Sequence, residues 1–380
     1  MASNPTLAAP AAEPHPIRER AQQSPPIDLS IPYSTSWLKG KTILVTGGAS
    51  GFGAGFCREW AAAGANVFIG DIDDKRAEEL VAEIRTSTGN QNVHFVHCDV
   101  TDWDSQVSLF RRTVELSPHG GIDIVVANAG VATTDPFMLP KVAPGSDEPQ
   151  KPNFKIININ LIGVMYTAHL AFFHLPRNPG APATLPANPD PEKDQRDKCL
   201  LLIGSLASLE GAPGQAQYSA AKHGVLGLFR SLRSGSFAAG MRVNLICPYF
   251  IDTPILPAMA RALLAGGATG KPEDVVDAGS RLVADTRIRG RALVVGPKVK
   301  VRQKDDGQYE LVEKADAQGK VEERAVWEPY AHDFEDSDTF SRSFVGLLNT
   351  VTAARGWAGW ASDMFAAVKY AIAKRELVRR

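Results

Sequence analysis

The chain has no excess of either charge. Lysine and arginine together number 41 against 42 aspartate and glutamate residues, so the formal net charge is −1. A nucleic-acid-binding surface needs a strong basic bias. The composition therefore excludes nucleic acid as an expected partner.

Cysteine is also scarce. The four cysteines are far apart among the 380 residues and form no C-x-x-C motif: Cys57, Cys98, Cys199 and Cys247. Such cysteines are typical of small buried side chains in a reducing compartment, and we expect a cytoplasmic protein. The eight histidines show no zinc-ligand spacing, so no metal site is predicted.

Long apolar runs are missing as well. No run is long enough to span a bilayer, and residues 1–37, rich in proline and alanine, contain no apolar core of the signal-peptide type. We interpret residues 1–37 as a disordered leader. What the chain does contain is 44% hydrophobic residues, which is enough to bury a large core at this length.

Short apolar runs alternate with helical patterns from residue 38 onward. The alternation predicts an α/β fold, namely a doubly wound, Rossmann-like, mostly parallel seven-stranded sheet with helices on both faces. Residues 38–297 would form this domain, and residues 298–380 a C-terminal extension that begins as a hairpin. The expected strands lie at 42–46, 66–70, 93–97, 122–127, 199–204, 242–246 and 291–295.

A glycine-rich turn follows the first expected strand. Thr46 ends that strand, Gly47, Gly51 and Gly53 follow, and a helical pattern begins at once. Strand, glycine turn and helix N-terminus together are typical of a dinucleotide site, because the backbone can approach the phosphates closely. The spacing is not G-x-G-x-x-G, so a glycine turn without a ligand remains the alternative.

Asp71 ends the second expected strand, about twenty residues past the glycines. A carboxylate there accepts hydrogen bonds from an adenosine ribose and repels a 2′-phosphate, which favours NAD over NADP. Lys75 and Arg76 lie close by and keep NADP open. Asp71 as a turn residue or helix cap is the other interpretation.

Tyr218 and Lys222 stand four residues apart in a helical pattern, so their side chains share one face. A lysine charge beside a phenol is expected to lower the phenol pKa and make it a usable acid or base. Ser205 ends the apolar run that precedes this helix and is placed to hold the same substrate oxygen. The same spacing recurs at Tyr370 and Lys374, where no strand precedes it, and we interpret that pair as a helix surface.

These motifs occur in one order on one chain, together with Ala127-Asn128-Ala129-Gly130 and Asn160. The chain thereby resembles the short-chain dehydrogenase/reductase family over about residues 38–297. The resemblance implies an enzyme that transfers a hydride between NAD(H) and a secondary alcohol or ketone. A dinucleotide-binding sensor or scaffold without catalysis is the alternative.

The resemblance implies four catalytic residues. Tyr218 would exchange the proton, Lys222 would lower the tyrosine pKa and bind the nicotinamide ribose, and Ser205 would orient the substrate oxygen. Asn160 would hold a water in a proton relay, and it is preferred to Asn158 because Leu161-Ile162-Gly163 after it fits the Asn-x-x-Gly pattern of the family.

The resemblance also implies a cofactor-binding set. Asp99 would contact adenine, and Asn128 would steady the central strand. The full set is Thr46, Gly47, Ser50, Gly51, Phe52, Gly53, Asp71, Asp99, Val100, Asn128, Ala129, Gly130, Tyr218, Lys222, Pro248 and Thr253. One position departs from the family, since Tyr249 follows Pro248 where glycine is usual. This departure puts the rate and the size of the substrate in doubt.

Two further segments bear on substrate and partners. Apolar residues between 255 and 264 would line the substrate side and favour an apolar lipid-, steroid- or polyketide-like substrate, although helix packing alone explains them. Residues 357–380 combine an aromatic stripe with basic residues, as interfacial membrane helices do. Peripheral membrane contact and packing on a protein surface both remain open. A homo-oligomer is implied by the resemblance.

Overall fold

A computed structural model of the chain describes residues 23–133, 135–182, 185, 196–212, 214–251, 269–303, 309–312 and 321–329. The chain divides into two compact units, Ala21–Ala331 and a second unit of Met1–Arg20 with His332–Arg380. All described residues belong to the first unit. Thr253, the apolar residues 255–264 and the predicted helix at 357–380 lie outside the described residues.

The described unit is built on one nine-stranded sheet with the order β3-β2-β1-β4-β5-β6-β7-β8, and β9 also pairs with β7. The first seven strands are parallel, and β8 and β9 are antiparallel to β7. The predicted doubly wound, Rossmann-like sheet is confirmed, with two strands more than expected. The strands are β1 (Thr42–Thr46), β2 (Asn66–Asp71), β3 (Val93–His97), β4 (Ile124–Ala127), β5 (Cys199–Ile203), β6 (Arg242–Pro248), β7 (Ala292–Gln303), β8 (Tyr309–Leu311) and β9 (Val321–Trp327).

Burial on both faces explains why the central strands are continuous apolar runs. Every residue of β1, β4 and β5 is buried, as expected for parallel strands covered by helices on both sides. The register pairs Thr46 with Gly70 and Ala127 with Leu202. The carboxyl ends of β1, β2, β4 and β5 therefore meet at one edge of the sheet.

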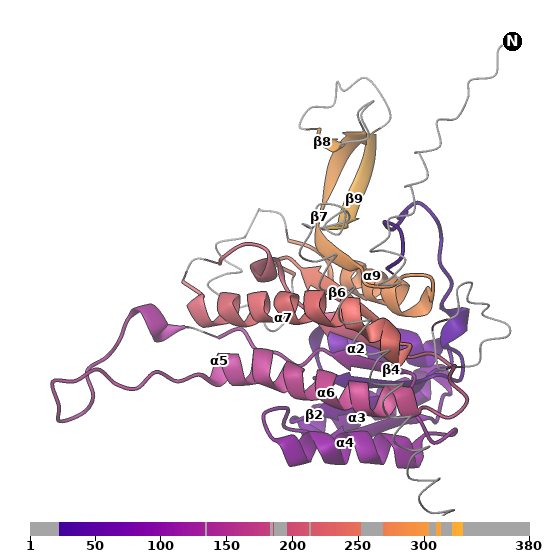
Figure 1. Ribbon diagram of the computed structural model, residues 1–380, viewed down its shortest axis with the longest axis horizontal. Helices are drawn as coiled ribbons and strands as arrows, with labels where there is room; N and C mark the ends of the chain where they lie inside the picture. Colours follow the sequence, from indigo (N-terminus) through magenta and orange to yellow (C-terminus); the bar gives the residue numbers. More distant parts are fainter. Residues whose placement is uncertain are drawn as a thin grey trace, which may run out of the picture. The chain divides into compact units, whose positions relative to one another are not determined.

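Helices cover both faces, as Figure 1 shows. Apolar side chains of α2, α3 and α9 form one core against the sheet, and those of α4, α6 and α7 form the other. Phe56, Trp60 and Leu282 belong to the first core, and Phe110 and Phe229 to the second. The helices are α2 (Gly51–Ala62), α3 (Asp74–Thr88), α4 (Trp103–Leu116), α5 (Lys155–Ile157), α6 (Val164–His174), α7 (Ala216–Gly235) and α9 (Pro272–Ala284).

The helical stretch Lys155–Arg177 corrects one expectation. It joins α5, the π-helical turn η3 (Asn158–Gly163), α6 and η4 (Leu175–Arg177). By length and composition alone it is long and apolar enough to cross a membrane. The sequence had led us to expect no run of that length. Its apolar composition has a simpler cause, because Val164, Ala168 and Ala171 are buried in the core beneath the sheet.

Part of the segment predicted to be a disordered leader is ordered. Residues 23–37 were expected to be disordered, but they lie against α9 and the chain before β7. Gln23 Nε2 donates to Gly290 O at 3.1 Å, Arg281 Nη1 donates to Ile31 O at 2.8 Å, and the Tyr33 hydroxyl donates to Asp277 O at 2.9 Å. Proline-rich backbone can order in this way when neighbouring side chains satisfy its polar groups.

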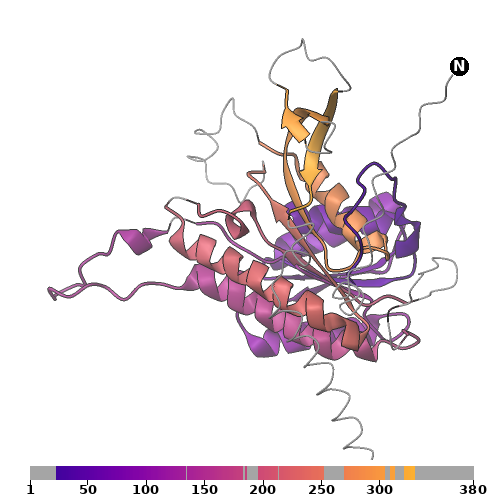
Figure 2. The ribbon, with the colours of Figure 1, turned by 45° about the horizontal axis from the view of Figure 1, so that its top comes forward.

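The sheet continues past the boundary expected at residue 297. That position lies inside β7, which runs to Gln303 and pairs antiparallel with β8 and β9 (Figure 2). The pairing of Val301 with Leu311 and Gln303 with Tyr309 gives the hairpin expected after residue 298. β9 in turn pairs with β7 at Val294 and Val295, and so lies along an edge that would otherwise be open to pairing with other chains.

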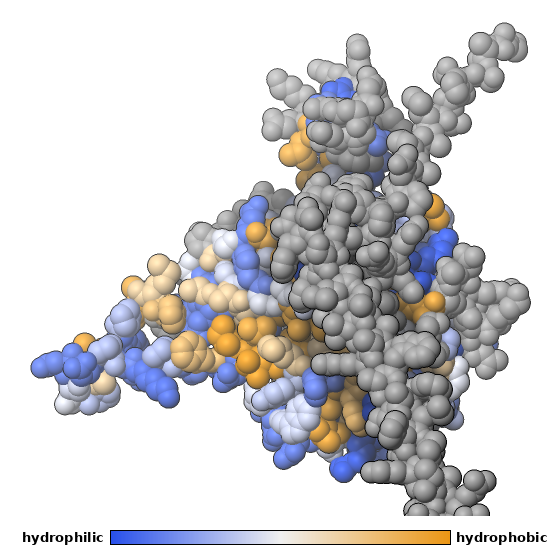
Figure 3. Space-filling model, in the orientation of Figure 1, coloured by the Kyte–Doolittle hydropathy of each residue, from blue (hydrophilic) through white to orange (hydrophobic). Residues whose placement is uncertain are grey.

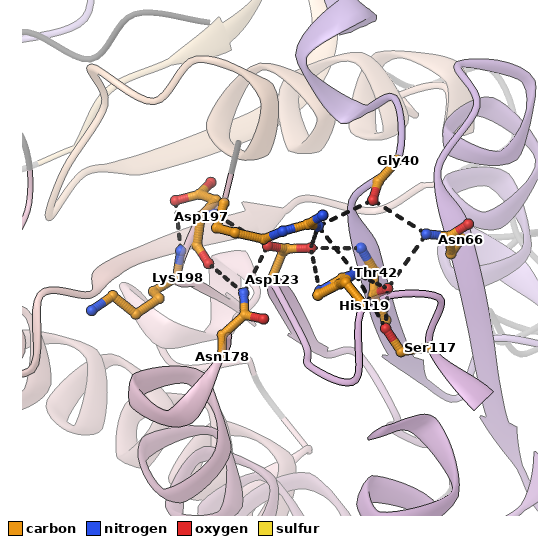
Figure 4. Close-up of polar contacts among 10 residues, drawn as sticks. Gly40, Thr42, Asn66, Ser117, His119, Asp123, Asn178, Asp197 and Lys198 are labelled. Atoms are coloured by element: carbon orange, nitrogen blue, oxygen red, sulfur yellow. Dashed lines mark hydrogen bonds and ion pairs between the residues drawn. The ribbon is translucent and has the colours of Figure 1, made fainter. Parts of the chain in front are cut away.

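A buried carboxylate joins the strands at their amino ends (Figure 4). Asp123 has no exposed surface. It accepts hydrogen bonds from Thr42 N at 2.8 Å, Asn178 Nδ2 at 2.7 Å and Asp197 N at 3.2 Å. Arg196 Nη1 also lies 3.3 Å from Asp123 Oδ2. The group links β1 and β4 to the chain before β5.

We expect Asp123→Ala to lower the free energy of unfolding by about 3–5 kcal/mol, because it leaves buried donors and a cation without their acceptor. Urea unfolding measures this. Asp104→Ala, on the exposed first turn of α4, is the control and should change stability by under about 1 kcal/mol. Equal stabilities for the two variants would contradict the role given to Asp123.

Candidate active site

The glycine turn between β1 and α2 fits closely against the end of β4. Gly47 has a φ of 61°, and a Cβ there would lie 2.7 Å from Ala129 Cα. A Cβ on Gly53 would lie 2.3 Å from Gly47 O and 2.6 Å from Asn128 Nδ2. These two positions therefore accept only glycine without movement of the backbone. The spacing of the glycines in the turn is therefore set by the close approach of the ends of β1 and β4.

Asn128 and Thr46 hold this turn in place. Asn128 Nδ2 donates to Thr46 O at 3.0 Å and to Gly47 O at 2.8 Å. The Thr46 hydroxyl accepts from Asn128 N at 3.1 Å and from Ala129 N at 3.3 Å. The backbone of β1 and β4 is thus locked together where a cofactor would pass.

The start of α2 has the character of a phosphate site. Ser50 is the N-cap residue, is exposed, and its hydroxyl makes no capping hydrogen bond. Gly51 has a φ of 53° with no atom within 4 Å of a Cβ built there, and Phe52 packs against the core of α2. Free N–H groups at a helix N-terminus bind phosphate. The turn therefore fits the pyrophosphate of a dinucleotide.

Asp71 lies against the glycine turn. Its carboxylate accepts from Ala49 N at 2.9 Å and from Asp73 N at 3.0 Å. Arg76 is one of the two basic residues that kept NADP as an alternative cofactor. Its Nε lies 3.4 Å from Asp73 Oδ2. The acidic group thus lies at the end of β2 beside the turn, where an adenosine ribose would be expected.

The end of β3 leads to Asp99 and Val100, two further residues of the predicted cofactor set. Asp99 Oδ1 accepts from Thr101 N at 2.9 Å. Val100 packs against Gly163, where a Cβ would lie 3.0 Å from Val100 Cγ2. The turn after β3 therefore touches the helix that carries Asn160.

Asn160 occupies the π-helical turn η3 and is fully buried, whereas Asn158 is exposed. Its Oδ1 accepts from Val131 N at 2.8 Å, and its Nδ2 donates to Val131 O at 2.8 Å. Gly130 lies beside it, since a Cβ there would be 3.3 Å from Asn160 Oδ1. The geometry favours Asn160 over Asn158 as the residue that meets the end of β4.

A buried glutamine supports this turn and was not anticipated from the sequence. Gln106, on α4, has no exposed surface. Its Nε2 donates to Val100 O at 2.7 Å and to Gly163 O at 2.9 Å, and its Oε1 accepts from Thr167 at 2.8 Å. No local pattern marks such a residue, because its partners lie on two distant segments, the turn after β3 and the helical stretch of η3 and α6.

Ser205, Tyr218 and Lys222 meet at the end of β5. Ser205 Oγ accepts from Ala207 N at 3.2 Å and lies 3.5 Å from Pro248 O, at the end of β6. Lys222, which is 5% exposed, donates from Nζ to Ile203 O at 2.9 Å. The same Nζ lies 5.8 Å from the centroid of the Tyr218 ring. The first turns of α7 therefore present a phenol and an ammonium beside a serine hydroxyl.

The electrostatics of the group differ from expectation. Burial raises the pKa of Tyr218, and a hydrogen bond with Ser205 opposes that rise without cancelling it. Burial also lowers the pKa of Lys222 to about 8. The expected lowering of the tyrosine pKa is not found, because desolvation of the phenolate outweighs the hydrogen bond with Ser205. At neutral pH the phenol is protonated and suited to donate.

Two neighbours complete the surroundings. Cys247 is buried beside Gly204, and burial raises the pKa of its thiol to about 12, so it is an unreactive packing residue. Tyr249 N donates to Val295 O at 2.7 Å, and its ring packs edge-on against Phe250 with centroids 4.9 Å apart. The residue that departs from the family pattern thus extends the β6–β7 ladder.

Within the part of the chain that the structure describes, no three His, Cys, Asp or Glu side chains gather as a metal site would require.

The family model for short chain dehydrogenases matches residues 41–183 and 190–263. The chain belongs to this family. It is 37% identical over 283 residues to the 5′-hydroxyaverantin dehydrogenase of Dothistroma septosporum, which covers 71% of this chain and 88% of the relative. It is 33% identical to an NADP-dependent dehydrogenase of a Phoma species, over 67% of this chain and 74% of that one.

A solved short chain dehydrogenase has the same fold. The 3-ketoacyl-(acyl-carrier-protein) reductase of Brucella melitensis, crystallised with NADH, is 27% identical. It superposes with a TM-score of 0.54, covering 68% of this chain and 97% of its own. The relatives are dehydrogenases and reductases of hydroxyl and keto groups, and this chain is an oxidoreductase of the same kind.

Gly53→Ala should weaken binding of a nicotinamide dinucleotide about fivefold or more, since overpacking of this turn costs about 1–3 kcal/mol. Calorimetric titration with NAD and NADP measures the affinity. Gly235→Ala, at the last residue of α7 where no atom lies within 4 Å of the added Cβ, is the matched control and should bind as the wild type does. Unchanged affinity in Gly53→Ala would show that the turn does not hold the cofactor.

Lys222→Met should abolish turnover without destabilising the fold at pH 7. A lysine pKa lowered from 10.5 to about 8 means that the buried charge costs the folded state about 3 kcal/mol. Removing the charge recovers this cost, and losing the hydrogen bond to Ile203 O takes back about 1–3 kcal/mol.

The difference in stability between Lys222→Met and the wild type should change with pH in a defined direction. Between pH 8 and pH 10.5 the unfolded lysine holds its proton and the folded one has released it, so the stability of the wild type rises with pH. Any advantage of Lys222→Met at pH 7 should therefore shrink above pH 8 in thermal unfolding. Lys155→Met, at the exposed start of α5, is the control. A Lys222→Met variant much less stable at pH 7 than at pH 10, relative to wild type, would refute the account.

Proposed function

We propose that the chain is an NAD-dependent dehydrogenase or ketoreductase of an apolar secondary alcohol or ketone. The observation that carries the proposal is the meeting of Ser205, Tyr218 and Lys222 at the end of β5, at the same sheet edge as the glycine turn. In an open parallel sheet, ligands bind outside the carboxyl ends of the strands. A cofactor on the turn and a substrate at Tyr218 would then share one edge.

Each residue has a part in the proposed reaction. The nicotinamide supplies the hydride acceptor or donor when it is bound. Tyr218 gives its phenolic proton to the substrate oxygen in reduction and takes the carbinol proton in oxidation. Ser205 holds that oxygen, and the Lys222 ammonium offsets the negative charge of the phenolate. Oxidation needs the lysine charge more than reduction does, because burial favours the neutral phenol.

Asp71 supports NAD as the cofactor. Its carboxylate is fixed beside the glycine turn by Ala49 N and Asp73 N, and a fixed negative charge repels the 2′-phosphate of NADP. The solved relative was crystallised with NADH, whereas another relative is named as NADP-dependent. The direct comparison of the two cofactors therefore belongs to the first test.

The aromatic pair at the end of β6 supports an apolar substrate. Tyr249 and the exposed Phe250 follow Pro248, whose carbonyl oxygen lies 3.5 Å from Ser205 Oγ. Aromatic rings so near the serine favour flat or alicyclic apolar groups. The relative named for 5′-hydroxyaverantin points to that compound as the first substrate to try.

Homo-oligomerisation is part of the proposal. The family is generally oligomeric, and Figure 3 shows apolar surface over the helix that runs from α5 into α6. Met165 and Phe173 on α6 are exposed there, and Trp103 of α4 lies beside Tyr166. An apolar patch of this kind is typical of a protein interface.

The cellular location and the membrane contact are also part of the proposal, and each rests on a single observation. All four cysteines are buried free thiols, which suits a reducing, cytoplasmic location. Peripheral membrane contact through residues 357–380 rests on their composition alone, since these residues lie outside the described ones.

The function is tested by titration with NAD and NADP, then by following NADH formation with 5′-hydroxyaverantin, borneol and cyclohexanol. We expect tighter binding of NAD than of NADP, and oxidation of at least one alcohol. Tyr218→Phe should lower kcat by about 10²–10⁴ with cofactor affinity retained. Tyr166→Phe, which keeps the ring on α6 against Trp103, is the matched control.

The outcomes separate the two candidate functions. NAD binding without turnover of any alcohol or of the matching ketones would favour the non-catalytic sensor or scaffold. Turnover that survives Tyr218→Phe would show that another group transfers the proton. Tighter binding of NADP would correct the cofactor alone.

A further inference from the structure

An aspartate from the loop after β4 lies at the start of the catalytic helix. Asp135 Oδ2 accepts from Gln217 N at 2.7 Å, and Asp135 Oδ1 accepts from Gln217 Nε2 at 3.0 Å. Gln217 is 5% exposed and directly precedes Tyr218. The Asp135 carboxylate, 82 positions away in sequence, thus holds Gln217, the residue next to Tyr218, by two hydrogen bonds.

The Asp135 carboxylate takes the place of a capping side chain, which α7 itself lacks. The N-cap residue of α7, Gln215, makes no side-chain capping hydrogen bond, and the first turn contains no acidic residue. Unsatisfied N–H groups and the positive end of the helix dipole favour an anion at this point. Partial burial works to raise the pKa of Asp135, but hydrogen bonds from Gln217 and Phe137 outweigh it and lower that pKa. The carboxylate is therefore charged at neutral pH.

The other end of the same segment is fixed to the catalytic asparagine. Val131 exchanges two hydrogen bonds of 2.8 Å with the side chain of Asn160. Asp135 follows only four residues later. Val131 therefore contacts the turn that carries Asn160, and Asp135 contacts the helix that carries Tyr218.

The orientation of the Gln217 amide follows from its partner. A carboxylate accepts hydrogen bonds and cannot donate them, so the Nε2 end must face Asp135. The Gln217 Oε1 atom is buried and has no hydrogen-bond partner among the described residues. The side chain is thus held in place by its donor end even though its acceptor end is left unsatisfied, at a cost in free energy.

We propose that Asp135 is a positioning residue that sets the place of Tyr218 through Gln217 and the first turn of α7. The proposal rests on the proposed function of Tyr218. Proton transfer demands that the phenolic oxygen stay at hydrogen-bond distance from the substrate oxygen, and a displacement of about 1 Å can cost about 100-fold in rate. The glycine turn and Asp71, which would hold the pyrophosphate and the adenosine ribose, lie on other segments, so the effect falls mainly on kcat.

The test compares Asp135→Ala, Asp135→Asn and Gln217→Ala in the full chain. The probe is NAD with whichever alcohol of the panel the wild type oxidises fastest. Asp135→Ala should lower kcat about 10- to 100-fold, with KM for NAD within about twofold of wild type. Asp135→Asn should restore part of the loss, because its amide oxygen still accepts from Gln217 N. Asp135→Ala combined with Gln217→Ala should lose little more than either alone.

The control is a cap of the same kind on another helix. Asp102 accepts from Asp104 N at 2.9 Å and from Ser105 N at 3.4 Å at the start of α4. Asp102→Ala should lower the melting temperature as Asp135→Ala does, yet leave kcat unchanged when both are measured well below that temperature.

Three results would overturn the proposal. One is a kcat for Asp135→Ala equal to that of wild type in a wild type that turns over. Another is an equal loss of kcat in Asp102→Ala, which would mean general destabilisation. Absence of turnover in the wild-type chain would overturn the proposed function and this inference with it, and so differs from the other two.

Discussion

The site depends on one buried cation. Lys222 is almost fully enclosed, its ammonium donates to Ile203 O at 2.9 Å, and no carboxylate among the described residues forms an ion pair with it. Burying a charge without a counter-ion is expensive, and here it lowers the lysine pKa to about 8. The hydrogen bond also ties α7 to the end of β5, which brings Tyr218 beside Ser205. Lys222 thus anchors the catalytic helix to β5, with its ammonium 5.8 Å from the centroid of the Tyr218 ring.

The polar groups at the two ends of the sheet have different surroundings. At the amino ends, Asp123 accepts hydrogen bonds from Thr42, Asn178 and Asp197 and holds neighbouring segments together. At the carboxyl ends, the polar groups lie where a cofactor and a substrate would bind. The Ser50 hydroxyl makes no capping bond, and the Tyr218 phenol and Lys222 ammonium lie together with burial opposing the charge of each. Groups whose pKa is shifted by burial in this way are typical of functional sites.

The sequence predicted what depends on neighbours along the chain. Strand, glycine turn and helix at residues 42–62 are a local pattern, and so is the four-residue spacing of Tyr218 and Lys222. It did not predict contacts between distant segments, such as Asp135 with Gln217 or Gln106 with Gly163. It also gave the wrong direction for the pKa of Tyr218, because the depth of burial is a property of the packed fold. The order at residues 23–37 was missed for the same reason, since the partners of that segment lie near residue 290.

The pKa of the Lys222 ammonium tests the account most directly. Protein labelled with ¹³C at lysine Cε can be titrated by NMR, and the resonance absent from Lys222→Met assigns the residue. The account predicts a midpoint near pH 8, well below the ordinary value of 10.5. A midpoint at or above 10.5 would mean that the charge is solvated or paired with a carboxylate, and the arrangement proposed for Tyr218 would then be wrong.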